Sequence, residues 1–225
     1  QFGNIAIFNV LVEILIIFVV MGGNTYFRVQ YFKTDDKSSL LGSVASSFIS
    51  TIPVAILLIF VIGYFDFNPA QHDNVWLVVA LIIATSQSVI LLALANYQCQ
   101  GKASYVGGLN LLSAAISGGV TLLLLNLDYG EQARYIAYAI ASLSVLVLAA
   151  VLYKRSNGSF PALSFKTSKP ALQFGVGVLP HALSWWARTG MDRIIITKFV
   201  SAHATGLYAV SAQLSLIVIV LSNAV

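Results

Sequence analysis

Residues Ala171–Lys198, which read ALQFGVGVLPHALSWWARTGMDRIIITK, are the segment around which the rest of the chain is organised. It is long enough to cross a bilayer as a helix, yet it contains Arg188, Asp192 and Arg193. Such side chains are costly inside a membrane and usually face a bundle interior or a water-filled cavity. At about 100° per residue, one side of the helix collects Gly177, His181, Ser184, Trp185, Arg188 and Asp192. The opposite side is apolar, so we expect only that side to meet lipid or packed neighbours.

Composition places the rest of the chain in a membrane as well. Of 225 residues, 58% are hydrophobic and 9% are charged, whereas a soluble domain carries roughly 25% charged residues. The mean hydropathy is +0.87. Apolar stretches of the roughly 20 residues that a spanning helix needs lie at about 5–27, 39–64, 74–97, 104–127, 134–153, 171–197 and 206–225. We predict an all-α integral membrane protein, a polytopic helical bundle.

The charges of the connecting loops predict the orientation. The connections after the first, third and fifth stretches hold Arg28, Lys33, Lys37, Lys102, Lys154, Arg155, Lys166 and Lys169. The alternate connections hold Arg134 and Lys198, beside Asp66, Asp73, Asp128 and Glu131. Because basic residues accumulate on the cytoplasmic side, the first set is expected there, and the net charge of +4 is no sign of nucleic-acid binding. Residue 1 then lies outside, so we expect one span before it and more chain after Val225.

A repeat predicts how the segments divide. Placing 2–22 over 205–225 without gaps pairs Gly3 with Gly206 and gives five identities in 21 positions. The offset of 203 residues spans six segments and preserves orientation, as in transporters built from parallel repeats. We therefore predict a first lobe over 1–155 that lacks its first helix, a cytoplasmic linker over 156–170, and the start of a second lobe over 171–225.

A family resemblance rests on the run GVGVLPHALSWWARTGMDRIIITKFVSAHATGLYAVSAQLSL, residues 175–216. The residues that carry it are Pro180, Asp192, Arg193, Gly206 and Tyr208, with Phe2, Gly3, Asn96, Gln98, Gly101 and Tyr105 elsewhere. In these positions the chain resembles bacterial polysaccharide-export flippases, in the superfamily of multidrug, oligosaccharidyl-lipid and polysaccharide exporters. The resemblance covers the chain as helices two to eight of a protein with 12 or 14 helices.

That resemblance implies a substrate and a place in the cell. Members of the family move undecaprenyl-diphosphate-linked oligosaccharide repeat units, such as those of O-antigen, capsule or exopolysaccharide, across the bacterial inner membrane by alternating access around a central cavity. The implied partners are the lipid-linked oligosaccharide, membrane lipids and other membrane proteins of polysaccharide assembly. We expect no nucleic-acid partner, no metal, and no cofactor beyond H⁺ or Na⁺ as a coupling ion.

The charged residues of 171–198 are the candidate substrate site. A guanidinium grips phosphate oxygens in a bidentate fork and stays charged at any working pH. Arg188 would bind the diphosphate, Asp192 would orient it from one turn further on, and Arg193, Ser184 and Trp185 would complete the cavity wall. The alternatives are a self-contained Arg188–Asp192 ion pair that only packs the bundle, and an Arg193 that extends to the outer headgroups.

Two further residues are candidates for ion coupling, and two for a hinge. Glu13 lies about 12 Å along the first stretch, from a rise of 1.5 Å per residue, and could take up a proton or cation or pair with Arg188. His181 could titrate near neutral pH or be a hydrogen-bonded bundle residue. Pro180 removes a backbone hydrogen bond beside Gly177, which predicts either a moving bend or a static kink.

No catalytic motif is present in the sequence. It contains no phosphate-binding Gly loop, HExxH or CxxC motif, and the lone Cys99 has no nearby His or Asp. We therefore expect a transporter and not an enzyme. The alternatives are another exporter of the superfamily (a drug or cation antiporter, or a lipid II flippase) and, less favoured by the short outer loops, a membrane-embedded polysaccharide polymerase or ligase.

Overall fold

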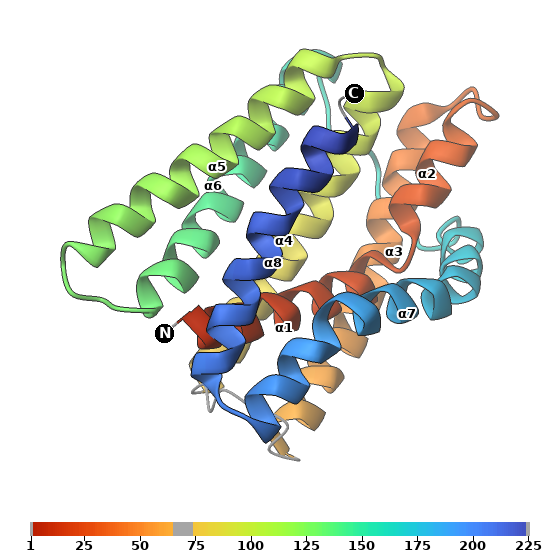
Figure 1. Ribbon diagram of the computed structural model, residues 1–225. Coiled ribbons are helices and arrows are strands. Elements are labelled where there is room, and N and C mark those ends of the chain that lie inside the picture. The colour runs from red at the N-terminus through yellow and green to blue at the C-terminus, as the bar shows by residue number, and fades with distance from the viewer. Residues whose placement is uncertain (1, 65–73, 224–225) are drawn as a thin grey trace.

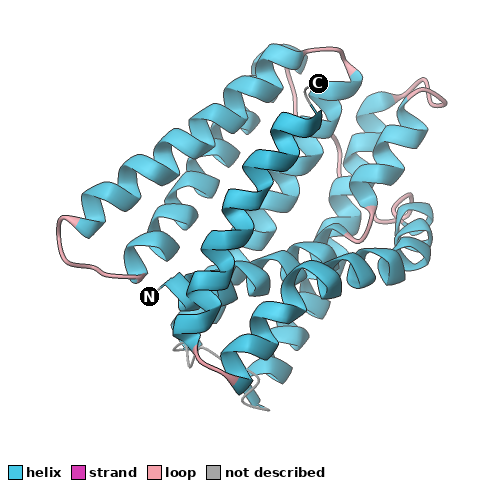
Figure 2. Cartoon of the chain, in the orientation of Figure 1, coloured by secondary structure: helices cyan, strands magenta, loops and turns pink. Residues whose placement is uncertain are grey.

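A computed structural model describes residues 2–64 and 74–223, and within those ranges every regular element is a helix (Figures 1 and 2). In chain order the helices are α1 (Phe2–Val20), α2 (Gly23–Tyr31), α3 (Lys37–Tyr64), α4 (Asn74–Cys99), α5 (Ala103–Leu125), α6 (Gln132–Asn157), α7 (Lys169–Phe199) and α8 (Ala202–Asn223). The predicted all-helical bundle is confirmed. Asp66 and Asp73, two of the loop charges from which the orientation is predicted, lie outside the described residues.

Five of these helices, α1, α3, α4, α5 and α6, are long and apolar enough to cross a membrane. The protein is thus a multi-pass membrane protein. The remaining long helices, α7 and α8, are not among these five within the described residues. Helix α7 has 31 residues and is about 46 Å long, but the polar residues on one of its sides lower its mean hydropathy.

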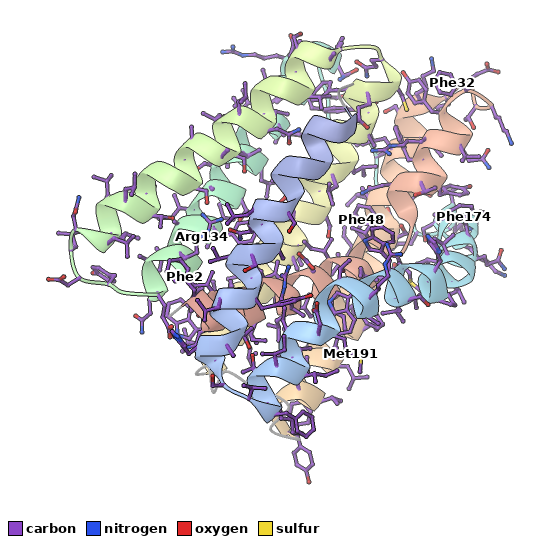
Figure 3. All side chains as sticks on the ribbon, in the orientation of Figure 1. Phe2, Phe32, Phe48, Arg134, Phe174 and Met191 are labelled. Carbon is purple, nitrogen blue, oxygen red and sulfur yellow. The ribbon has the colours of Figure 1, made fainter. Side chains whose placement is uncertain are left out.

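The first apolar stretch is not one helix, which corrects the sequence prediction. The helix ends at Val20, and a new helix begins at Gly23. Between them Met21 and Gly22 have positive φ values of 43° and 70°, a left-handed conformation that a helix cannot continue through and that favours glycine. The chain turns sharply at this point (Figure 1). Phe48 of α3 and Phe174 of α7 lie against the start of α2 (Figure 3).

The core lies where α1 and α2 pack against α3, α4 and α6. Phe8 and Tyr135 stack with ring centroids 4.2 Å apart, and Trp76 meets Tyr135 edge-on at 5.1 Å. Phe27 and Val44 are also fully buried in this cluster. Because lipid is as apolar as these side chains, close packing and hydrogen bonding must supply the association between helices.

The connection between α6 and α7 packs against α3. Residues 158–168 are non-helical, so this segment is shorter than the predicted linker over 156–170. The backbone N–H of Ser164 donates to Ser46 Oγ at 2.8 Å. A Cβ added at Gly42 would lie 2.1 Å from the carbonyl oxygen of Ala162. Gly42 therefore lets the two backbones touch, and the connection is docked on α3.

The N-terminal ends of α1 and α8 meet through small residues. A Cβ added at Gly3 would lie 1.8 Å from the Ala202 carbonyl oxygen, and one at Gly206 would lie 3.1 Å from the Gly3 backbone nitrogen. Gly3 and Gly206 are partners in the repeat alignment, which extends to residues 224 and 225 outside the described range. The division of the chain into two lobes stays a prediction.

Candidate functional site

Helix α7 lies on α1 through its apolar side. The indole Nε1 of Trp186 donates to the Val10 carbonyl at 3.1 Å, and a Cβ added at Gly190 would lie 3.1 Å from Val10 Cγ1. On the polar side, Ser184, Trp185 and Arg188 are exposed. The two sides of α7 thus have different surroundings.

A cavity of about 410 Å³ lies between α1 and α7. It brings together Glu13 and Arg193, which are 180 positions apart in the chain, and its lining is Glu13, Ile16, Ile17, Trp185, Trp186, Thr189 and Arg193. Arg193 Nε is buried and has no hydrogen-bond partner among the described residues. Glu13 and Arg193 form no direct ion pair within the described residues, so the guanidinium can donate hydrogen bonds to an anionic oxygen and the carboxylate can bind a cation.

Arg188 lies outside the lining of this cavity. Its Cζ lies 4.1 Å from the ring centroid of Trp185, a cation–π contact between two exposed side chains. It forms no ion pair with Asp192 within the described chain. The geometry therefore gives Glu13 the neighbour Arg193 in place of Arg188, and places Arg188 at the exposed edge of Trp185.

Asp192 joins α7 to α8. Its Oδ1 accepts a hydrogen bond from the backbone N–H of Arg193 at 2.7 Å, and its Oδ2 accepts a hydrogen bond from the hydroxyl of Tyr208. The hydroxyls of Thr197 and Thr205 lie 2.7 Å apart across the same pair of helices. Tyr208 was singled out by the family resemblance but not assigned to the site. Its contact with Asp192 makes it a residue that sequence reasoning missed.

The remaining candidates of α7 are separated from the cavity. His181 is exposed, and Ser184 Oγ donates within its own helix to the Pro180 carbonyl at 2.8 Å. A Cβ added at Gly177 would meet no atom within 4 Å. Helix α7 continues through Pro180 and changes direction part-way along its length (Figure 1), which is consistent with a kink at that residue.

A second polar cavity, of about 310 Å³, lies between the N-terminal half of α1, the C-terminal end of α5 and the N-terminal end of α6, and α8 contributes one residue to its lining. Its polar lining residues are Asn9, Thr121, Glu131, Arg134 and Gln213. Phe2 also lines it and is labelled with Arg134 in Figure 3. Asn4 Nδ2 donates to Glu131 Oε2 at 2.9 Å, and Arg134 Nη1 donates to Ser117 Oγ at 2.7 Å. The sequence showed Glu131 and Arg134 only as loop charges, because nothing in it shows which helices meet there.

No group of three or more His, Cys, Asp and Glu side chains that could hold a metal ion occurs among the described residues. Both polar cavities instead offer one cationic and one anionic side chain among neutral hydrogen-bonding groups. Such a lining suits a charged, hydroxyl-rich ligand.

Comparison with known proteins supplies the family. The whole chain, residues 1–225, matches the family described as polysaccharide biosynthesis protein. This chain belongs to that family. The chain is also 31% identical over 147 residues to "Lsg locus putative protein 1" of Haemophilus influenzae. That match covers 62% of this chain and 36% of the relative, so the chain spans little more than a third of its length. No solved structure matches the chain significantly.

Proposed function

We propose that this chain is part of an inner-membrane flippase that moves undecaprenyl-diphosphate-linked oligosaccharide units for surface polysaccharide synthesis. The observation that carries the proposal is the cavity between α1 and α7, which is lined by Glu13 and by Arg193, whose buried Nε has no hydrogen-bond partner among the described residues. Ionisable residues inside membrane segments usually mark functional sites, and the family membership supplies polysaccharide synthesis as the context.

In this proposal Arg188, which lies over the exposed ring of Trp185, binds the diphosphate first, and Arg193 then holds it in the cavity. The guanidinium suits this role because its planar fork matches phosphate oxygens and it is never neutral. Asp192, hydrogen-bonded to Tyr208, keeps α7 and α8 together while the lobes move. Glu13 takes up the coupling ion, and His181, which is exposed and outside the cavity lining, is the weaker candidate for that task.

The protein acts as a transporter and not as an enzyme in this proposal. The described outer connections are short, running between Leu125 and Gln132 and between Phe199 and Ala202, and they leave little chain for a catalytic domain of a polymerase or ligase. The partners are the lipid-linked oligosaccharide, membrane lipids and other proteins of polysaccharide assembly.

The test compares Arg193→Ala, Arg193→Lys and Arg188→Ala in the complete protein, in cells that lack the native copy. Surface polysaccharide is measured at matched membrane expression, together with the lipid-linked precursor that accumulates inside. We expect Arg193→Ala to abolish export and to raise the internal precursor. Arg193→Lys should retain part of the export, because the charge remains but the bidentate fork is lost.

Thr189→Val is a matched control, because it changes the same cavity wall without changing its charge. It should retain more export than Arg193→Ala. Normal export by Arg193→Ala at matched expression would refute the diphosphate role of this residue. Loss of export without accumulation of precursor would point to a failure before transport and would also contradict the proposal.

A further inference from the structure

The bundle has an apolar crevice away from both polar cavities. It lies between α3, α4 and α6, has a volume of about 150 Å³, and is walled at one end by the beginning of the α6–α7 connection. Its lining includes Leu41, Ala45, Leu92, Ala149, Phe160 and Pro161. Small residues on each of the three helices leave this space, and exposed Val89 and Phe160 on its edge show that it opens to the outside of the bundle.

A polar pocket adjoins the crevice at those ends of α3, α4 and α6 that the loop charges predict to be cytoplasmic. Leu41 and Tyr153 line both spaces. The polar pocket has a volume of about 250 Å³, and its polar lining includes Lys37, Ser38, Asn96, Gln100, Asn157 and Ser159. An apolar crevice beside a polar, cationic pocket matches the two parts of a membrane lipid: the crevice can take an acyl chain, and the pocket can take the headgroup.

The charge of the polar pocket selects the headgroup. Lys37 Nζ lies 4.7 Å from the ring centroid of Tyr31, a cation–π contact that holds the ammonium group at the pocket. Lys154 and Arg155 follow Tyr153 in the last turn of α6 and are exposed. The nearest acidic residue in sequence, Asp36, accepts the backbone N–H of Ser39 at 2.9 Å. Asp35 and Asp36 precede Lys37 in the chain but line neither the polar pocket nor the crevice, so Lys37 is the charged side chain of the pocket lining and offers its ammonium group to a phosphate.

We propose that this crevice binds an anionic phospholipid of the cytoplasmic leaflet, with one acyl chain between α3, α4 and α6 and the phosphate at Lys37. Anionic headgroups attract basic residues at the cytoplasmic surface, and Asn96, Gln100 and Ser38 supply neutral hydrogen-bonding groups around the ammonium. The crevice and the cavity that contains Arg193 are formed by different helices, so this lipid is distinct from a ligand bound at Arg193.

A bound lipid has a structural consequence for the α6–α7 connection. Phe160 stacks on Tyr153 with ring centroids 6.3 Å apart, and Pro161 completes the same wall. The next residues are fixed to α3 by the hydrogen bond between Ser164 and Ser46. A lipid chain in the crevice therefore contacts the connection just before its docked part and should slow its detachment from α3.

The test uses the complete protein, purified in detergent and titrated with dioleoyl phosphatidylglycerol or dioleoyl phosphatidylcholine. Binding is read from the increase in melting temperature with lipid concentration and from retained lipid in native mass spectrometry. We expect phosphatidylglycerol to bind more tightly than phosphatidylcholine. Lys37→Gln should weaken phosphatidylglycerol about five-fold, the effect of one basic residue near an anionic headgroup, and leave phosphatidylcholine unchanged.

Matched controls separate the site from general effects. Lys33→Gln removes an exposed lysine of the same loop and should leave phosphatidylglycerol binding unchanged. Ala93→Phe fills the crevice and should abolish binding of both lipids, whereas Ala114→Phe, on the exposed surface of α5, should not. If Ala93→Phe fails to fold, the comparison of Lys37→Gln with Lys33→Gln still decides the headgroup site.

Three outcomes would overturn the proposal. Equal affinity of wild-type protein for the two lipids would remove the headgroup site. Displacement of phosphatidylglycerol by inorganic phosphate at equal concentration would show a free-anion site. Equally tight binding of undecaprenyl phosphate, lost in Ala93→Phe, would assign the crevice to the polyprenyl chain.

The Arg193→Ala variant distinguishes a failure of this proposal from a failure of the flippase proposal. Because Arg193→Ala leaves the crevice intact, it should bind phosphatidylglycerol normally even where it fails to export polysaccharide.

Discussion

Replacing Gly175 with alanine should destabilise the protein, whereas the same replacement at Gly177 should not. Both glycines lie on α7, two residues apart, but their surroundings differ. A Cβ at position 175 would lie 2.0 Å from the carbonyl oxygen of Met21 and 3.0 Å from its carbonyl carbon. At position 177 it would meet nothing within 4 Å. The clash involves backbone, which cannot rotate away as a flexible side chain could.

The magnitude follows from two terms. Alanine stabilises a helix by about 0.5–1 kcal/mol relative to glycine, and this gain applies to both variants. Overpacking costs about 1–3 kcal/mol, and this cost applies at Gly175 alone. The difference between the variants therefore isolates the clash, at about 1–3 kcal/mol. For a chain of this size each kcal/mol shifts the melting temperature by about 2–4 °C.

The assay is thermal unfolding in detergent, followed by tryptophan fluorescence and circular dichroism on each variant at equal concentration. Gly177→Ala should melt at or above the wild-type temperature, and Gly175→Ala several degrees below it. Equal melting temperatures for the two variants would refute the close contact between α7 and the α1–α2 turn. Export is measured on the same pair: reduced export by a fully stable Gly177→Ala would support a hinge at this glycine.

Two further predictions concern contacts between elements. Gly42→Val should detach the α6–α7 connection, because the added Cβ would lie 2.1 Å from a carbonyl oxygen of that connection; trypsin should then cleave faster after Lys166, while Gly108→Val, with no atom within 4 Å, should leave the rate unchanged. Tyr208→Phe and Asp192→Ala should not be additive, because each removes the same hydrogen bond. A double-mutant cycle on unfolding should give a coupling of about 0.5–1.5 kcal/mol, at the lower end because both groups are partly exposed; strict additivity would mean that the contact contributes nothing.

The lengths of the apolar stretches and their periodicity predict most of the helices without any knowledge of tertiary contacts. The stretches at 39–64, 74–97, 104–127 and 134–153 correspond to α3 to α6 within a few residues. The break at Met21–Gly22 escaped prediction because the apolar run continues through it. Two adjacent glycines, Gly22 and Gly23, were the available signal, but glycine is also common in spanning helices.

Part of the candidate site could likewise be predicted from the sequence, and part of it depends on packing. Spacing alone predicted that α7 has one polar and one apolar side, because helical periodicity depends only on spacing. Arg188 and Asp192 belong to the polar side, and Arg193 was a candidate because it is a charge inside an apolar stretch. Which of these charges meets Glu13 depends on how the helices pack. Arg188 and Arg193 are five residues apart, about 140° around the helix from 100° per residue, so packing of Trp186 and Gly190 against Val10 turns Arg193 toward α1 and leaves Arg188 exposed. Spacing fixes which residues share a side of a helix, but the direction of that side depends on the neighbour against which the helix packs.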